Sequence, residues 1–144
     1  MANVVPNAFK GELLSGTHNF ASGGDSFKLA LYTANPYTTS STAYSSGAGN
    51  EVSGSAAGYS SGGSALTSQA VASSTATASV DFANLTFSSA TFSAAFGAIY
   101  NDDKSDKLVV ILDFGGTKTA TNGDFKIVFP ATGTPANAII SLAS

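Results

Sequence analysis

The stretch ATFSAAFGAIYNDDKSDKLVVILDFG, residues 90–115, holds two apolar segments joined by a short polar one. In the first segment apolar side chains recur at every second position, the period of a β-strand with one buried face. We expect that face to be shared by Phe92, Ala94, Phe96, Ala98 and Tyr100. Residues 107–115 form the most apolar segment and are expected to be a central strand, whereas the polar residues 101–106 predict a turn.

Shorter strand patterns lie on both sides of this pair. DSFKLALYTA, residues 25–34, alternates in hydrophobicity, and Pro36 ends this strand because it supplies no N–H to a ladder. Further patterns, separated by Gly, Asn, Asp or Pro, are SALTSQAVAS (64–73), ATASVDF (76–82), LTF (85–87), GDFKIVFP (123–130) and NAIISLA (137–143). In the segment 123–130, one face is expected to hold Phe125, Ile127 and Phe129.

Many short strands without helical periodicity after residue 16 predict an all-β fold, an antiparallel β-sandwich with jelly-roll-like topology. One short helix is expected over residues 7–16. Its expected features are Asn7 as N-cap, an apolar side made of Phe9, Leu13 and Leu14, and Gly16 at its end. We interpret residues 1–144 as a single domain, with residues 1–16 as its N-terminal segment.

Residues 35–63 are mostly Ser, Gly, Ala and Thr. This segment is not a linker between domains, because residues 1–34 hold one helix and one strand and cannot fold alone. It is therefore a long loop, and loops of this length are uncommon unless they have a function or are disordered. Its Tyr37, Tyr44 and Tyr59 suit a contact surface that is wet on one side. We favour an arm ordered by a partner over plain disorder.

The composition excludes several classes of function. Six Lys and Arg residues and a net charge of -3 argue against binding to nucleic acid. The absence of Cys excludes disulfides, iron–sulfur clusters and thiolate sites for metals. The N-terminus lacks the pattern of a secretory signal, and no apolar run approaches the roughly 18 residues that span a bilayer, so no membrane partner is expected.

The residues suited to catalysis are few and poorly arranged. His18 is the only histidine, no GxSxG motif is present, and we interpret His18 as a structural residue at the end of the helix. A glycosidase needs two facing carboxylates, for which Asp81 and Asp113 are the candidates, although acids at strand ends usually have a structural role. We therefore expect no enzymatic activity and no cofactor.

The turn at residues 101–106 holds a cluster of oxygen ligands of the kind that calcium prefers. It consists of Asn101, Asp102, Asp103 and Asp106. The spacing does not fit the D-x-[DN]-x-[DN]-G loop, and polar hairpin turns often have this composition. We expect no metal.

Five phrases, AFKGELLSGTHNF, FKLALYT, NEVSGSAAGYSSGGSAL, ATFSAAFGAIYND and VVILDFGGTKT, follow one another in order, and the match that they carry extends over nearly the whole chain. As a set they resemble a family of small virion structural proteins of tailed bacteriophages. Members of that family share a helix ending in a GTHNF-like phrase, a KVALYT-like strand, a NEVSGTGYTAGG-like loop and an LDFG strand. This chain departs from the pattern by the insertion SAA at residues 55–57.

The resemblance implies a non-enzymatic component of the virion, made in the host cytoplasm. From the small size, low charge and polar arm, we expect a capsid decoration (cement) protein on the capsid surface, a homo-oligomer, expected to be a trimer, that binds the major capsid protein. The segments 1–10 and 35–63 would make the contacts. The candidate interface residues are Phe9, Tyr37, Tyr44, Glu51 and Tyr59.

Two alternatives stay open. One is a tail or baseplate component that binds a carbohydrate receptor by stacking on Tyr37, Tyr44 and Tyr59. The other is a small cell-wall hydrolase, which would have to use either His18 or the pair Asp81 and Asp113.

Overall fold

The computed structural model describes residues 3–74, 76–130 and 138–143. Residues 1–2 of the predicted N-terminal segment and Asn137 of the last predicted strand lie outside these ranges. The elements are α1 (Asn7–Leu14), β1 (Phe27–Tyr32), β2 (Ser64–Ala65), β3 (Ala70–Ser74), β4 (Thr77–Asp81), β5 (Leu85–Asn101), the 3-10 helix η1 (Asp102–Lys104), β6 (Lys107–Ile127) and β7 (Ile140–Ala143).

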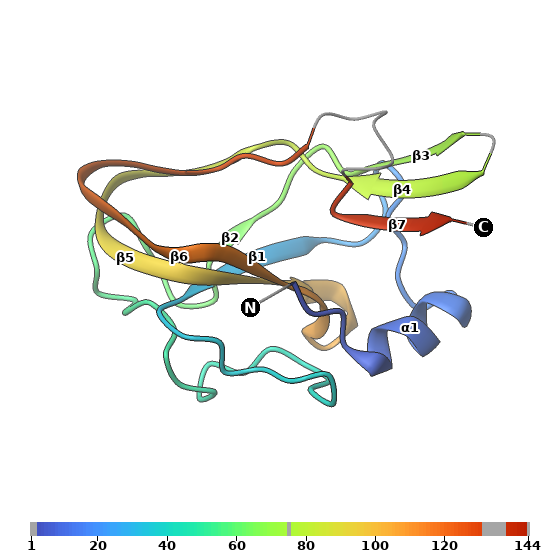
Figure 1. Cartoon of the computed structure of the whole chain (residues 1–144), viewed down its shortest axis with the longest axis horizontal. Coiled ribbons are helices and arrows are strands. Elements are labelled where there is room, and N and C mark those ends of the chain that lie inside the picture. Colours follow the sequence, from blue (N-terminus) through green and yellow to red (C-terminus); the bar gives the residue numbers. More distant parts are fainter. Residues whose placement is uncertain (1–2, 75, 131–137, 144) are drawn as a thin grey trace.

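The strands form two antiparallel sheets, with the orders β2-β1-β5-β6 and β3-β4-β7. Figure 1 shows the smaller sheet above one end of the larger one, with α1 below it. The all-β class with one α-helix is confirmed. None of the helices in the described part of the chain has the length and apolar character needed to cross a bilayer.

The hairpin of β5 and β6 is much longer than the sequence predicts. Residues 85–87 and 90–100, expected as two strands, belong to one strand of 17 residues, and β6 runs for 21 residues. The hairpin follows β1 in the lower layer, turns over at one end of the molecule and returns above it (Figure 1). One bent hairpin therefore contributes to both layers, and the expected jelly-roll topology is not confirmed.

Bulges produce this bend. The register between β5 and β6 shifts at four points: between Phe87 and Ala90, Ala90 and Phe92, Ala94 and Phe96, and Ile99 and Tyr100. Ser89 adopts a φ of 52° at the first shift, and Gly115 and Gly116 adopt positive φ on the opposite strand near the third. An extra residue in a strand reverses which side chains face the core.

The predicted common face of the residues from Phe92 to Tyr100 is therefore wrong. Phe92 and Ala94 pack in the core between the two sheets. Beyond the shift between Ala94 and Phe96, the side chains of Phe96, Ala98 and Tyr100 lie on the opposite face of the larger sheet, in a separate apolar cluster. Strict alternation cannot anticipate this change, because a bulge alters the period at one point only.

The most apolar segment also occupies an unexpected position. The strand β6 is the last of its sheet and not a central strand. Its first half is covered by the N-terminal segment, since Val4 exchanges two backbone hydrogen bonds with Ile111, at 2.9 and 2.8 Å. Residues 108–111 are buried on both faces because apolar clusters lie on either side of the sheet.

Aromatic rings fill the core between the two sheets. Phe20 stacks on Phe27 at 4.5 Å between ring centroids, and Phe27 contacts Phe82 edge to face at 5.6 Å. The predicted face formed by Phe125, Ile127 and Phe129 is confirmed, because all three are buried in this core. Such rings supply most of the apolar area that a small β-protein can bury.

The helix differs from the prediction in its N-cap and in its apolar side. Pro6 is the N-cap and Asn7 is the first helical residue, so Asn7 makes no capping hydrogen bond. Of the expected apolar side, Phe9 is buried, whereas Leu14 is 90% exposed. The helix ends where expected, with Gly16 at a φ of 72° directly after the last turn.

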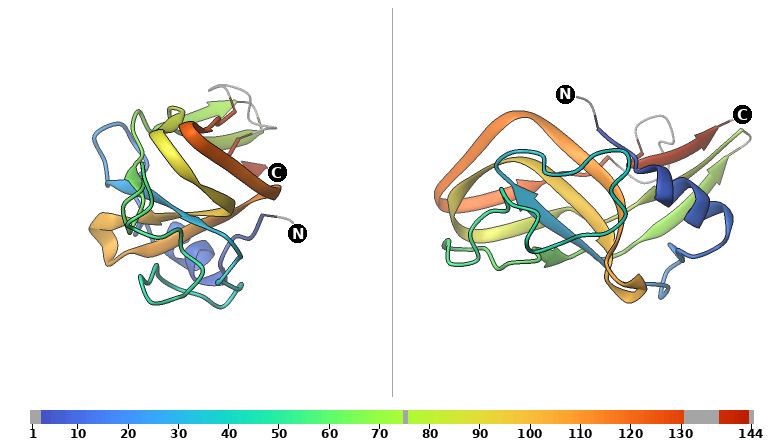
Figure 2. Two further views of the ribbon diagram at one scale, coloured as in Figure 1. Left: turned by 90° about the vertical axis from the view of Figure 1, so that its left-hand side faces the viewer. Right: turned by 90° about the horizontal axis from the view of Figure 1, so that it is seen from below.

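The segment 35–63 covers the outer face of the larger sheet, as Figures 1 and 2 both show. Its backbone bonds directly to the sheet, through Val52 N–H to Leu31 O at 2.9 Å and Leu108 N–H to Thr42 O at 3.0 Å. A second apolar cluster lies beneath it, made of Ala30, Tyr32, Tyr37, Ala98, Tyr100, Leu108 and Ile111. The arm is thus held by its own chain, and the expectation that only a partner orders it is corrected.

A matched pair of glycine substitutions tests this packing. A Cβ at Gly63 would lie 1.8 Å from the Leu29 carbonyl oxygen, and its φ of +76° disfavours any side chain. We expect Gly63→Ala to lower the free energy of unfolding by at least about 2 kcal/mol. Gly11 in α1 has open space at its Cβ, so Gly11→Ala should raise it by about 0.5–1 kcal/mol. Urea denaturation measures both, and equal effects would contradict the packing.

Candidate functional site

The structure places the predicted interface residues mostly in the interior. Phe9, Tyr37 and Tyr59 are buried, and Tyr44 and Glu51 are half-buried. The three buried rings are therefore not available to a partner, and their expected role in an interface is corrected. The reason is that the larger sheet is apolar on both faces, so the tyrosines of the arm are needed to cover its outer face.

Tyr44, Glu51 and Tyr59 do come together, around the Glu51 carboxylate. Glu51 Oε2 accepts the Tyr44 hydroxyl at 3.0 Å, and Oε1 accepts the Tyr59 hydroxyl at 2.8 Å and the Gly62 N–H at 2.7 Å. We call this group of four residues the Glu51 clasp. Tyr59 also accepts the Leu31 N–H at 3.0 Å, which connects the clasp to β1. The sequence predicts an interface role for Tyr44, Glu51 and Tyr59, whereas in the structure they bond to one another and hold the arm.

Further tyrosines extend the clasp into the sheet. The Tyr100 hydroxyl donates to Gly62 O at 2.7 Å, and Tyr44 stacks on Tyr100 at 4.5 Å. Burial raises the pKa of Tyr44, and the hydrogen bond to the Glu51 carboxylate raises it further. Burial and Glu51 likewise raise the pKa of Tyr59, against the lowering effect of the Leu31 N–H. These phenols thus stay protonated and act as structural donors.

Removing the carboxylate should release the arm. Glu51→Ala leaves the Tyr44 and Tyr59 hydroxyls and the Gly62 N–H without their acceptor, at an expected cost of about 3 kcal/mol in the free energy of unfolding. Protease cleavage within residues 35–63 should also become faster. The control is Asp124→Ala at an exposed carboxylate, expected within about 0.5 kcal/mol of wild type. A Glu51→Ala effect no larger than the control would argue against the clasp.

His18 makes structural contacts through both ring nitrogens. Nδ1 lies 2.9 Å from Asn101 Nδ2, and Nε2 lies 3.0 Å from Glu12 Oε2. Because the Asn101 amide nitrogen can only donate, Nδ1 is the acceptor and Nε2 donates its hydrogen to Glu12. The ring also packs between Phe9 and Phe20, at 5.1 and 6.0 Å. His18 thus orients no serine, and its structural interpretation is confirmed.

Two carboxylates complete what we call the His18 network, which consists of Glu12, His18, Asp25, Asn101 and Lys107. Lys107 Nζ lies 2.5 Å from Glu12 Oε1. Asp25 Oδ2 accepts the Asn101 amide at 2.8 Å and the Asn19 N–H at 2.9 Å. The network joins α1, the loop that follows it and the turn between β5 and β6, so its charges serve to close the fold.

The network makes stability depend on pH. Burial raises the pKa of Glu12, but hydrogen bonds from Lys107 and His18 outweigh it and hold this pKa below its usual 4.5. Burial also raises the pKa of Asp25, and the Asn19 N–H, Asn101 and Lys104 together hold it below 3.8. A carboxyl with a lowered pKa in the folded state stabilises fully above its unfolded pKa, and this contribution is lost as the pH falls through the folded pKa.

We therefore expect the free energy of unfolding to fall as the pH decreases below about 4.5. The double variant Glu12→Gln and Asp25→Asn should be less stable at neutral pH and lose less stability on acidification. Asp124→Asn, at an exposed carboxylate, is the control and should keep the wild-type slope. Denaturant titrations at a series of pH values measure the slopes, and equal slopes in all three proteins would exclude the network as the cause.

The structure does not bring the two carboxylates Asp81 and Asp113 together. Asp81 lies on β4 of the smaller sheet and accepts the Phe82 N–H at 2.8 Å. Asp113 lies on β6 and accepts the Gly115 N–H at 2.9 Å. They line different hollows. At the turn, Asp102 pairs with Lys28 and Asp103 accepts the Ser26 N–H. No cluster of three or more His, Cys, Asp or Glu suited to a metal occurs among the described residues.

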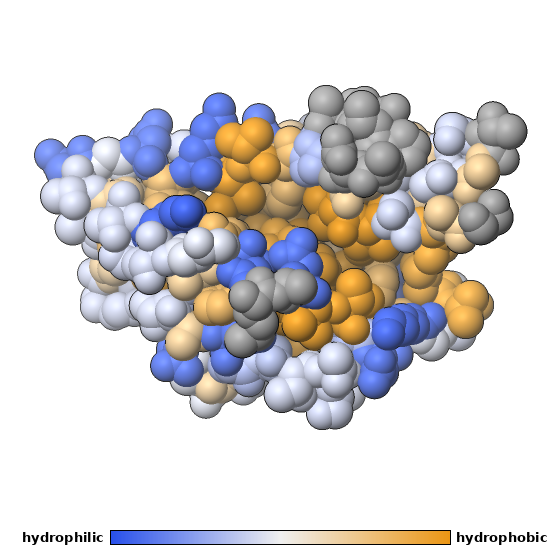
Figure 3. Space-filling model, in the orientation of Figure 1, coloured by the Kyte–Doolittle hydropathy of each residue, from blue (hydrophilic) through white to orange (hydrophobic). Residues whose placement is uncertain are grey.

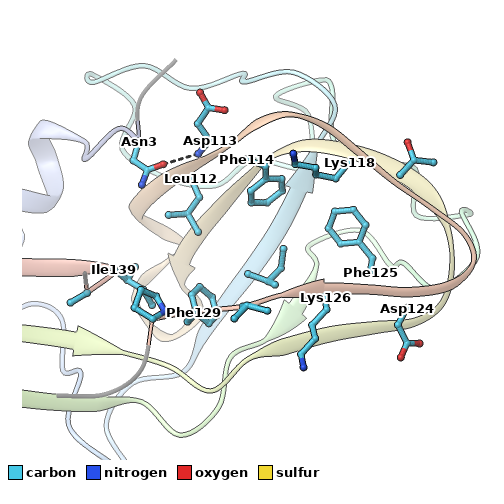
Figure 4. Close-up of a pocket in the computed structure, with 15 residues that line it drawn as sticks. Asn3, Leu112, Asp113, Phe114, Lys118, Asp124, Phe125, Lys126, Phe129 and Ile139 are labelled. Atoms are coloured by element: carbon cyan, nitrogen blue, oxygen red, sulfur yellow. Dashed lines mark hydrogen bonds between the residues drawn. The ribbon is translucent and has the colours of Figure 1, made fainter. Parts of the chain in front are cut away.

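Sequence reasoning missed a groove of about 580 Å³ on the open side of the sandwich. It lies between the two halves of β6, and its apolar lining consists of Leu112, Phe114, Phe125, Ile127, Phe129 and Ile139. Figure 3 shows apolar residues around the hollow on this face. In Figure 4 the Phe114 and Phe125 rings point into the space, whereas Asp124 and Lys126 point away from it. The groove thus offers apolar contact with a charged rim.

The sequence holds only an indirect signal for this groove. Gly115 and Gly116 directly follow the apolar Phe114 and mark the point at which β6 changes direction. That pattern predicts a turn. The contact of Phe114 with Phe125 across the bend, at 6.4 Å between ring centroids, follows only from the fold.

Comparison of the chain with family models, with curated proteins and with solved structures gives no match.

Proposed function

We propose that this protein is a non-enzymatic structural component of a tailed-bacteriophage virion, which decorates the head by binding the major capsid protein. The family resemblance of the sequence supports the assignment to a virion. The proposed contact with the capsid protein is supported by the outer surface of the arm, residues 35–63. Its single charged residue, Glu51, is turned inward into the clasp, so the exposed surface of the arm is neutral and rich in hydroxyl groups.

This surface is also held in place before any partner binds. Side-chain hydroxyls accept backbone N–H groups within the arm, as in Gly47 N–H to Ser45 Oγ and Ser55 N–H to Ser53 Oγ. A preorganised surface loses less conformational freedom on binding, and low charge is typical of the buried centre of protein interfaces. Many copies on a symmetric shell then need only modest affinity each.

The polar networks support a structural rather than a catalytic role. His18 uses both ring nitrogens within the fold, and Glu12 and Asp25 are bonded to lysine and amide groups. The Asp81 and Asp113 side chains each bond a backbone N–H close in sequence. These are the groups that a hydrolase would have to use, and each has a structural task.

The alternative of a carbohydrate-binding tail component has less support. Stacking on a sugar requires exposed rings, but Tyr37 and Tyr59 are buried and Tyr44 is stacked on Tyr100.

Imaging of the particle distinguishes a location on the head from one on the tail. Cryo-electron microscopy of the virus that carries this gene, with antibody-labelled particles, should show the protein on heads. Its presence on detached tails would overturn the decoration proposal.

The surface of the arm is tested by charge insertion rather than deletion, because residues 38–60 contain the buried Val52 and Tyr59. The variant carries Ser40→Lys, Ser46→Lys and Ser55→Lys, three exposed positions. We expect at least about tenfold weaker binding to empty heads in co-sedimentation, because three charges would be desolvated at the contact.

The matched control carries Thr86→Lys, Thr117→Lys and Thr121→Lys, exposed positions on the β5–β6 hairpin. It adds the same charge away from the arm and should bind heads as wild type does. Both variants should unfold at the wild-type denaturant concentration, since surface substitutions cost within about 0.5 kcal/mol. Equal loss in both variants, or none in either, would refute the arm as the contact.

A further inference from the structure

The strand edges of this protein are protected to very different degrees. The edge strand β2 has only two residues. On β6, the Asp113 N–H donates to Asn3 Oδ1 at 2.8 Å and the Gly115 N–H to Asp113 Oδ1 at 2.9 Å, while Val4 pairs with Ile111. Short strands and side-chain caps are the usual means by which proteins prevent pairing of an exposed edge with another chain.

The edge strand β7 has no such protection. Its sequence, ISLA, contains no charged residue and no proline. It pairs with β4 on one side, and in the described part of the chain no hydrogen bond is made to its other edge. Ser141, Leu142 and Ala143 are exposed, Leu142 by 57% of its surface. An exposed, uncharged edge of this kind invites another strand.

Apolar side chains continue from this edge across the smaller sheet. Val71, Val80 and Ile140 are register partners in one row, and the next row contains Ala78 and Leu142. Val80 is buried in the core between the sheets, so this is the inward face, yet Val71 remains 56% exposed. The end of the smaller sheet therefore projects beyond the core, above the end of α1 (Figures 1 and 2).

We propose that β7 is a self-association edge, at which two copies of this chain pair their β7 strands antiparallel about a two-fold axis. The two smaller sheets would join into one six-stranded sheet in the order β3-β4-β7-β7-β4-β3. A two-fold axis brings the same edge of each copy together, so both β7 edges are used and the outer strands of the joined sheet are the two β3 strands. The occupant is a second copy because ISLA carries no charge that would repel itself.

The pairing also covers apolar surface that the monomer leaves open. Leu142 of each copy lies near the axis, and Val71 lies on the same face two strands away. This pairing requires only the chain itself and does not depend on the capsid attachment proposed above. It replaces the expected trimer by a dimer as the unit that would bind a lattice.

The absence of Cys allows a direct test by cross-linking. Ser141→Cys and Leu142→Cys each place one thiol near the middle of β7, where a two-fold axis brings identical residues face to face. Oxidation of the full-length chain should convert at least one of these variants mainly to a covalent dimer. Val128→Cys is the control, because Val128 is 68% exposed but lies outside β7, and it should stay monomeric on denaturing gels.

A second measurement uses the charge that natural edge strands carry. Light scattering coupled to size-exclusion chromatography should show a dimer for wild type. The substitution Leu142→Asp should raise the dissociation constant of this dimer by about tenfold or more. Val128→Asp should leave the dimer intact. A monomeric or trimeric wild type, or equal cross-linking at residues 128, 141 and 142, would overturn the proposal. If wild type is a dimer but does not bind heads, the capsid proposal is refuted and the β7 pairing stands.

Discussion

The architecture depends on one constraint, the bend of the β5–β6 hairpin. Two continuous strands of 17 and 21 residues pass from the lower layer to the upper one, and the bulges near Ser89 and at Gly115 and Gly116 turn them over without breaking their pairing. The core lies inside the bend. The open side of the same bend leaves the groove lined by Phe114 and Phe125, because none of the strands in the described ranges closes the sandwich there.

The bend also explains why the arm is folded. Beyond the shift between Ala94 and Phe96, β5 turns Phe96, Ala98 and Tyr100 to the outer face, so the larger sheet needs a cover on that face. The arm supplies tyrosines with one apolar and one polar end, and the Glu51 carboxylate accepts the hydroxyls of Tyr44 and Tyr59. A polar segment can thus be ordered when a few of its side chains meet an apolar sheet.

Charged groups in this protein are few, and most hold parts of the fold together. The His18 network joins α1 to the turn of the long hairpin, and Lys28 pairs with Asp102 of the same turn. This use of charge leaves large parts of the surface neutral. A neutral surface repels other proteins weakly, so the exposed face of the arm and the bare edge of β7 suit the contacts proposed for them above.

From its sequence alone, the chain could be recognised as all-β with one short N-terminal helix, because alternation, turn residues and helix signals are local properties. The buried face of Phe125, Ile127 and Phe129 and the structural place of His18 were predictable for the same reason. Only the tertiary structure decided the position of β6 at an edge, the two faces of β5, the Glu51 clasp and the groove. These features arise where bulges change the strand period and distant residues meet, and neither event leaves a periodic signal in the sequence.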